Sequence, residues 1–192
     1  MIRILTSAVI CGFMFCDAWG QAGEYDVIIR NGTIYDGSGK PGVVGDVALQ
    51  DDKIVAVGKW EGIRGKAEID ATGLAIAPGF INMLSWATES LIHDGRSQSD
   101  IRQGVTLEVF GEGWSMGPLN DSMKKESEEQ QGDIKYKVEW TTLGDYLDFL
   151  VKRGISTNVA SFVGATTVRI NTLGYADRVP TAQELEQMKN LV

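Results

Sequence analysis

The sequence predicts an α/β protein in which a small antiparallel β unit precedes alternating strands and helices. Three observations support this fold class. Turn pairs such as Asn31-Gly32 and Asp36-Gly37 separate β-rich runs before Pro78. After Pro78, short apolar runs alternate with segments of helical spacing. Apolar residues form 43% of the 192-residue chain and 23 residues are glycine, so a globular core with many turns is expected.

Residues 1–22 have the pattern of a secretory signal peptide. Arg3 precedes an apolar run over 4–15, and small residues suited to cleavage follow it. The run is about half as long as a membrane-spanning helix, so an uncleaved anchor is the weaker alternative. Cleavage would remove Cys11 and Cys16, the two cysteines of the sequence, so disulfides are not expected. We therefore expect a secreted or periplasmic protein without a stable membrane span after cleavage.

Residues 23–78 are predicted to form the antiparallel β unit. A β-rich run begins at Tyr25, and the segments 46–50 and 53–58 face each other across Asp51-Asp52 as a hairpin. Two further runs, 67–70 and 74–77, flank the turn at Thr72-Gly73. Pro78-Gly79 stops this pattern, so a domain boundary is expected there.

Residues 79–192 are predicted to alternate strands with helices, which implies parallel strand pairing. Strands are expected within 80–85, 105–110 and 157–163. Helices are expected at 97–103 with Ser97 as its cap, at 142–153 closed by Gly154, and from 181 onward with a Thr181/Glu184 capping box. The charge-rich stretch 121–137 is interpreted as a solvated insertion without chemistry.

Composition excludes several function classes. The chain has 18 Lys and Arg against 26 Asp and Glu, a net charge of −8, which argues against a nucleic-acid partner. Its one histidine, His93, has no partner at metal-ligand spacing and is interpreted as an exposed loop residue, so a self-contained zinc enzyme is nearly excluded. A Rossmann or P-loop nucleotide-binding module is a poor third hypothesis. The sequence has two short glycine pairs, Gly37-x-Gly39 and Gly111-x-Gly113, but they lack the glycine spacing and the lysine of nucleotide-binding loops.

Three early segments, 25–37, 69–73 and 77–81, resemble the entry of the amidohydrolase superfamily into its barrel. Within that superfamily, 100–106, 158–164 and 180–185 are similar to the N-acyl-D-amino-acid deacylases, so the resemblance covers 25–192. It implies a small β-sandwich built from both chain ends and a (β/α)8 TIM barrel. Residues 23–78 would be the N-terminal sandwich portion, and 79–192 the first strands and helices of an incomplete barrel, with the rest beyond Val192.

The resemblance also implies a divalent metal, usually zinc, as the cofactor. Its first two ligands in the family are a His-x-His on strand one, where this sequence has Leu84 and Trp86. The cysteine expected after strand two is absent from Gly111-Glu112-Gly113-Trp114, and Ala165 replaces a further histidine. We therefore do not expect residues 79–192 to bind a metal alone.

Few residues are candidates for the site. Glu112, at the mouth of strand two, is the candidate metal ligand, with turn capping or solvent exposure as the alternative. Trp86 and Trp114 are candidate walls of an acyl pocket for a small-molecule substrate, with ordinary burial as the alternative. Glu89, Asp94 and Arg96 follow strand one and either contact substrate or face water.

Two function hypotheses follow. In the first, the chain is part of an exported hydrolase of non-peptide C–N amide bonds, with N-acyl-D-amino acids as substrates and a metal held partly by later strands. Residues 25–192 alone are then expected to be inactive. In the second, the metal site has degenerated and the barrel binds a ligand or partner without turnover, which Leu84 and Trp86 favour.

Overall fold

The computed structural model describes residues 25–192. The predicted signal peptide, residues 1–22, lies outside the described residues. The chain divides after Pro78 into two compact units, which are described separately.

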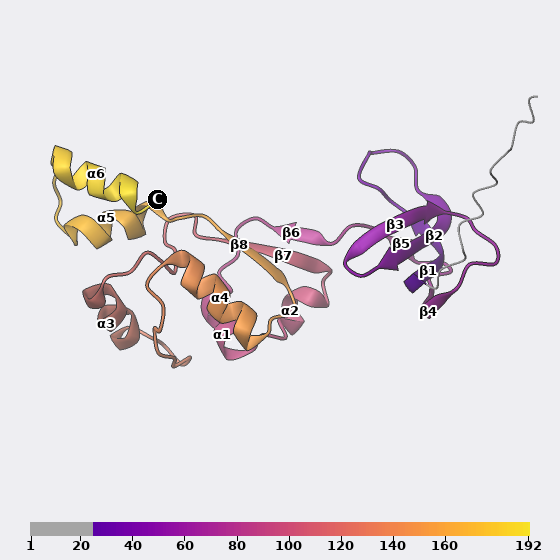
Figure 1. Cartoon of the computed structure of the whole chain (residues 1–192), viewed down its shortest axis with the longest axis horizontal. Helices are drawn as coiled ribbons and strands as arrows, with labels where there is room; N and C mark the ends of the chain where they lie inside the picture. Colours follow the sequence, from indigo (N-terminus) through magenta and orange to yellow (C-terminus); the bar gives the residue numbers. More distant parts are fainter. Residues whose placement is uncertain (1–24) are drawn as a thin grey trace, which may run out of the picture. The chain divides into compact units, whose positions relative to one another are not determined.

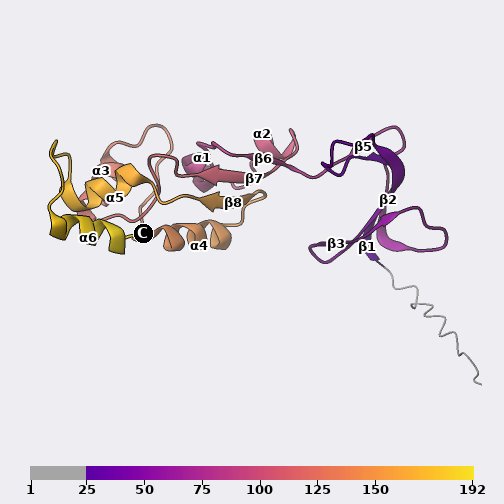
Figure 2. The ribbon, with the colours of Figure 1, turned by 90° about the horizontal axis from the view of Figure 1, so that it is seen from above.

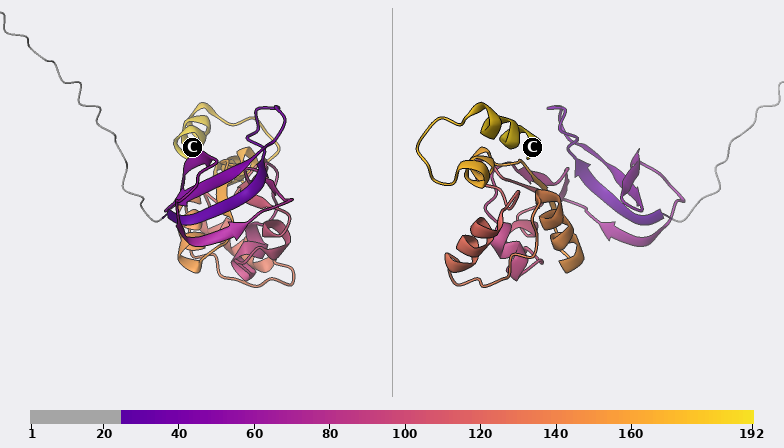
Figure 3. Two further views of the ribbon diagram at one scale, coloured as in Figure 1. Left: turned by 90° about the vertical axis from the view of Figure 1, so that its right-hand side faces the viewer. Right: turned by 60° about the vertical axis from the view of Figure 1, so that its left-hand side comes forward.

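The first unit contains a five-stranded sheet with the order β3-β2-β1-β4, in which β5 also pairs with β1 (Figure 3). The hairpin between β2 and β3 is confirmed, because Asp46 pairs with Gly58 and Gln50 with Lys53. The strands are β1 (Tyr25–Ile34), β2 (Val43–Gln50), β3 (Lys53–Gly58), β4 (Gly65–Asp70) and β5 (Ala75–Ile76).

The prediction that this unit is antiparallel was wrong for two of its pairings. β1 pairs in parallel with both β4 and β5, because the chain returns after β3 to the start of β1, where Tyr25 is opposite Gly65. Arg30 on β1 holds the returning segment: its guanidinium donates to the carbonyl of Ile63 at 2.7 Å and pairs with Glu68 at 3.0 Å. The described residues of this unit form one sheet, so the second layer of a sandwich stays a prediction.

The second unit contains three parallel strands in the order β6-β7-β8, as the strand and helix alternation predicted (Figures 1 and 2). The carboxyl ends of these strands therefore lie at one edge of the sheet. The strands are β6 (Phe80–Asn82), β7 (Val105–Phe110) and β8 (Asn158–Ser161). The helices are α1 (Thr88–His93), α2 (Gln98–Ile101), α3 (Asp121–Glu129), α4 (Leu143–Arg153), α5 (Ala165–Leu173) and α6 (Ala182–Asn190).

The predicted caps of α4 and α6 are confirmed. Thr142 caps α4 in a capping box with Asp145, and Thr181 caps α6 in a capping box with Glu184. Each box satisfies backbone N–H groups that a helix start leaves without partners. Gly154 ends α4 at φ 83°, a left-handed conformation that glycine adopts without steric cost.

Ser97 does not cap a helix as predicted. Its φ of 42° is left-handed, its side chain makes no cap hydrogen bond, and α2 spans only Gln98–Ile101. The hydroxyl instead donates toward two carboxylates, that of Glu108 on β7 at 3.1 Å and that of Asp100 at 3.2 Å, and accepts no backbone N–H of α2. Helices α1, α3 and α5 were not predicted.

The core of the second unit lies between β7 and the helices α1 and α4, which contact each other (Figure 1). Phe110 on β7, Leu91 on α1 and Tyr146 on α4 belong to one cluster of buried side chains. The ring of Trp140 lies 5.1 Å from that of Tyr146, which extends the core toward the α3–α4 connection. Burying each such side chain contributes about 1.5–3 kcal/mol to folding. Within residues 25–192, no helix combines the length and the apolar character needed to cross a membrane.

Candidate functional site

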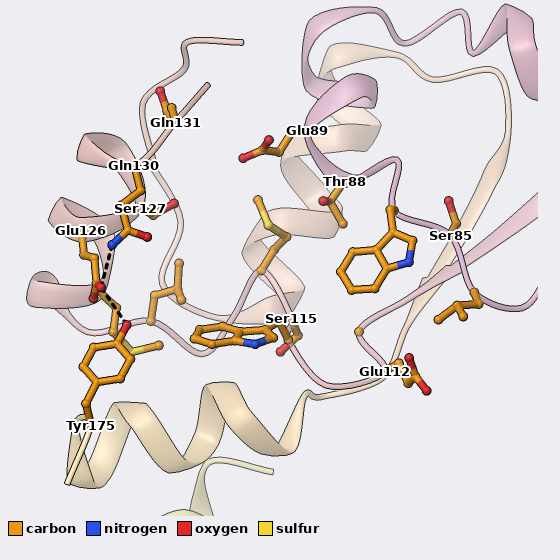
Figure 4. A pocket seen from close by; sticks show the side chains of 17 residues that line it. Ser85, Thr88, Glu89, Glu112, Ser115, Glu126, Ser127, Gln130, Gln131 and Tyr175 are labelled. Carbon is orange, nitrogen blue, oxygen red and sulfur yellow. Dashed lines mark hydrogen bonds between the residues drawn. The ribbon is translucent and has the colours of Figure 1, made fainter. Parts of the chain in front are cut away.

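A cavity of about 330 Å³ opens beyond the carboxyl ends of β6 and β7 (Figure 4). Its walls come from the segments that follow these two strands, from α1, from α3 and its end, and from Tyr175, which follows α5. The lining residues are Leu84, Ser85, Trp86, Thr88, Glu89, Gly111, Glu112, Trp114, Ser115, Met116, Leu119, Met123, Glu126, Ser127, Gln130, Gln131 and Tyr175.

The candidate metal ligand and the two candidate pocket walls from the sequence all line this cavity. Trp86 follows β6, and Glu112 and Trp114 follow β7. Trp86 is 72% exposed and Trp114 is 52% exposed, so residues 25–192 do not bury either indole. Exposed indoles on a concave surface can stack against an apolar ligand group.

Glu112 is exposed at one end of the cavity (Figure 4). Its carboxylate makes no hydrogen bond or ion pair with any residue in 25–192, so it does not cap the turn after β7. Gly111 before it has φ 85°, and a Cβ at this position would overlap the carbonyl of Phe162. The strand therefore needs glycine here to deliver Glu112 to the cavity.

The loop that carries Trp114 is fixed by hydrogen bonds to the start of α5. The backbone N–H of Ser115 donates to the hydroxyl of Thr167 at 2.8 Å, and its own hydroxyl accepts from the N–H of Gly164 at 2.9 Å. Ser115 and Thr167 are both buried, so these bonds are shielded from competing water.

Two further carboxylates line the cavity. Glu89 accepts a hydrogen bond from the hydroxyl of Tyr136 at 2.8 Å. Glu126 accepts from the hydroxyl of Tyr175 at 2.8 Å and from Gln130 at 2.9 Å (Figure 4). Burial, together with the hydrogen bond and charge of Glu89, raises the pKa of Tyr136 to about 12. No lysine or arginine is among the cavity residues in the described part of the chain, so these residues give the cavity a negative charge.

The charge-rich stretch 121–137 has a larger role than the sequence interpretation gave it. Its α3 is capped by Asn120, whose side chain accepts from the N–H of Met123 at 3.0 Å, and Met123 is buried. Met123, Glu126, Ser127 and Gln130 lie three, four and seven residues apart along α3 and its end, so they share the face that lines the cavity. This helical spacing could have been found in the sequence, but the stretch was interpreted from its many charged residues alone.

The remaining charged candidates after β6 behave differently from one another. Glu89 reaches the cavity, whereas Asp94 and Arg96 pair with each other at 2.8 Å on the surface. His93 is exposed as predicted, but it is the last residue of α1 rather than a loop residue.

The described residues do not fit a metal site by themselves. Across residues 25–192, no group of three His, Cys, Asp or Glu side chains is placed to hold an ion. Leu84 and Trp86 lie beside the cavity and offer an alkyl group and an indole N–H, neither of which donates a lone pair to a cation.

No protein-family model matches the chain. Two curated proteins of Alcaligenes xylosoxydans xylosoxydans are similar to nearly all of it. A D-aminoacylase is 30% identical over 171 residues, which cover 87% of this chain and 34% of that protein. An N-acyl-D-aspartate deacylase is 33% identical over 177 residues, which cover 92% of this chain and 35% of that protein. The chain thus spans about a third of the length of the curated relatives it matches.

Solved structures match over the same extent. A crystal structure of a D-aminoacylase, described as defining a novel subset of amidohydrolases, is 30% identical with a TM-score of 0.73, and the match covers 87% of this chain and 35% of that one. An N-acyl-D-glutamate deacylase from Bordetella bronchiseptica, bound to zinc and a phosphonate inhibitor, also has a TM-score of 0.73 at 24% identity. This second likeness shows the fold alone.

Proposed function

Since the chain is homologous to the N-terminal portion of D-aminoacylases of the amidohydrolase group, we propose that it is the first part of an enzyme that hydrolyses the amide bond of N-acyl-D-amino acids. The whole protein would carry the activity. Residues 25–192 alone are expected to be inactive, because they correspond to about a third of the similar enzymes.

The observation that carries this proposal is the position of the cavity. It lies at the carboxyl ends of parallel strands, where barrel enzymes place their active sites, and it gathers Trp86, Glu112 and Trp114 from two neighbouring strand ends. We propose that β6, β7 and β8, with their helices, are the first βα units of a (β/α)8 barrel.

In this proposal the apolar part of the cavity holds the acyl group. Trp86, Trp114 and Met116 supply flat or flexible apolar surface for an alkyl chain. The carboxylates of Glu89 and Glu126 line the remaining space, and the described cavity residues include no lysine or arginine. A second negative charge on the substrate would be repelled there, so we propose N-acyl-D-amino acids with uncharged side chains.

Zinc or another divalent metal would have to be held mainly by residues outside 25–192, because no group of three potential ligands lies within them. Similar D-aminoacylases are described with a binuclear metal centre. In this chain Glu112 is the group proposed to contribute a ligand, because its carboxylate is free at the cavity mouth. Later strands would have to supply the other ligands.

A second candidate function is ligand binding without turnover. Leu84 and Trp86 favour it, because they stand where the similar family keeps two metal ligands. The same cavity would then hold a small apolar molecule with no hydrolytic step.

The proposed substrate class is tested with the purified full-length protein that contains this chain, loaded with zinc. N-acetyl-D-methionine and N-acetyl-D-aspartate are compared by the release of free amine. We expect release from the methionine compound and at least about tenfold less from the aspartate compound, which corresponds to about 1.4 kcal/mol of charge repulsion. Faster release from the aspartate compound would contradict the role given to the carboxylates of Glu89 and Glu126.

We further propose export, based on Arg3 and the apolar run over 4–15. Fusion of residues 1–24 to a reporter is expected to deliver a processed reporter outside the cytoplasm. A cytoplasmic reporter that keeps Met1 would contradict it.

A further inference from the structure

Glu108 is a fully buried carboxylate in the middle of β7, with 0% of its surface exposed. One carboxylate oxygen, Oε2, accepts from the hydroxyl of Ser85 at 2.6 Å. The other, Oε1, accepts from the hydroxyls of Ser97 and Thr157, each at 3.1 Å. No ion pair joins Glu108 to a cation in residues 25–192. A buried carboxylate held only by neutral hydroxyls is uncommon, so its location calls for a physical reason.

The three hydroxyl donors come from three different connections of the second unit. Ser85 follows β6, Ser97 lies between α1 and α2, and Thr157 directly precedes β8. The two oxygens of one carboxyl group offer enough acceptor sites for all three hydroxyls at once. An apolar residue at position 108 would leave three buried hydroxyls without this acceptor.

Ser85 connects this network to the cavity. Its backbone N–H donates to the carbonyl of Val109 at 2.9 Å, and its hydroxyl accepts from the N–H of Ala87 at 3.2 Å. The segment thus stays attached to β7 although β6 ends at Asn82. Ser85 is 7% exposed, whereas Leu84 and Trp86 on either side of it are 51% and 72% exposed and line the cavity.

We infer that Glu108 is a positioning residue: through the hydroxyl of Ser85 it fixes the segment that presents Leu84 and Trp86 to the cavity. Both cavity residues are too exposed for their own packing to hold them. The anchor is the buried pair Ser85 and Glu108, whose hydrogen bond of 2.6 Å is short. This inference rests on the proposed function only where it treats the cavity as the substrate site.

Amide hydrogen exchange tests the anchor directly. In Ser85→Ala and in Glu108→Leu we expect exchange at residues 85–88 to become about tenfold faster or more, because local opening of this segment becomes easier. Ser97→Ala and Thr157→Ala are matched controls, since each removes one hydroxyl from Glu108 and leaves Ser85 bound. In these controls exchange at 85–88 is expected to stay within about twofold of the parent once the rates are corrected for any change in global stability. Ser85→Thr keeps the hydroxyl and should restore slow exchange.

Two results would overturn the inference: unchanged exchange at 85–88 in Ser85→Ala, or an equal increase in all four variants. If Glu108→Leu does not fold, exchange at the amide of residue 85 in Ser85→Ala and Ser85→Thr still decides, because this N–H is bonded to the carbonyl of Val109 and not to the removed hydroxyl. In an active full-length protein, Ser85→Ala is expected to raise KM more than it lowers kcat. If the variants show the expected exchange pattern but the full-length protein hydrolyses no substrate, only the proposed function is refuted. If the full-length protein hydrolyses substrate but exchange at 85–88 is unaltered in Ser85→Ala, only the positioning role of Glu108 is refuted.

Discussion

The hydroxyl of Tyr136 donates a hydrogen bond to Oε1 of Glu89 over 2.8 Å, so the segment between α3 and α4 is tied to the cavity wall on α1. Burial, with the bond and charge of Glu89, raises the pKa of Tyr136 from 10.0 to about 12. The neutral phenol is therefore favoured by folding. Its contribution to stability is complete below pH 10 and is lost as the pH rises through about 12.

The first prediction is that the protein loses folding stability at alkaline pH and that Tyr136→Phe makes this loss smaller. The parent should lose stability between pH 10 and about 12, whereas phenylalanine cannot titrate and removes this residue's share of the loss. Burial also raises the pKa of Tyr146, so part of the loss remains in the variant. Urea midpoints at pH 8 and pH 11 measure the difference. An identical drop in both proteins would contradict the assignment.

The second prediction concerns the start of α4. Thr142→Ala removes the side chain that accepts from the N–H of Asp145 at 3.0 Å, so the free energy of unfolding should fall by about 1 kcal/mol. Thr141→Ala is the matched control, since the Thr141 hydroxyl contacts only the surface amine of Lys124 among the hydrogen bonds of residues 25–192. Its effect should stay within about 0.5 kcal/mol. Equal losses in the two variants would argue against the capping role.

The third prediction concerns why glycine is needed at two positions: Gly154 for its backbone conformation alone, and Gly111 also because a side chain would not fit. Gly111 and Gly154 have φ of 85° and 83°, but only at Gly111 would a Cβ overlap a neighbouring backbone carbonyl, that of Phe162. Gly154→Ala should cost about 1 kcal/mol from the left-handed conformation, and Gly111→Ala should cost at least about 1–3 kcal/mol more. Denaturant unfolding measures both. Similar costs at the two positions would show that β7 can shift away from Phe162.

The fourth prediction concerns Glu112 in the full-length protein. If its free carboxylate contributes a metal ligand, Glu112→Gln should lower zinc affinity about tenfold or more. Glu139→Gln, an exposed carboxylate outside the cavity residues, is the control and should leave the zinc content unchanged. Elemental analysis with a competing chelator measures both. Unaltered zinc in Glu112→Gln would remove this residue from the metal site.

The sequence predicted best those elements that nearby residues determine. The hairpin across Asp51-Asp52 and the caps at Thr142 and Thr181 depend on contacts a few residues apart, and the structure contains them. The parallel pairing of β1 with β4 and the bond from the Ser97 hydroxyl to Glu108 depend on distant partners, which spacing does not show.

The candidate site was likewise predicted only in part from the sequence. Trp86, Glu112 and Trp114 could be grouped in advance, because they follow neighbouring strands whose carboxyl ends meet at one edge. The contribution of α3 was missed, since Glu126 and Gln130 belong to a stretch whose charge resembles that of a solvated surface. Glu108 was missed because a glutamate within a strand gives no sign in sequence that three hydroxyls surround it.

The most direct test of the proposed function compares the two enantiomers of one substrate. The full-length protein containing this chain, purified with zinc, is incubated with N-acetyl-D-methionine and separately with N-acetyl-L-methionine, and free methionine is measured. The proposal predicts release from the D compound, little or none from the L compound, and loss of the D activity when a chelator removes the metal. Binding of the D compound by a folded, zinc-supplied protein without any release of methionine would contradict it and support the non-catalytic alternative.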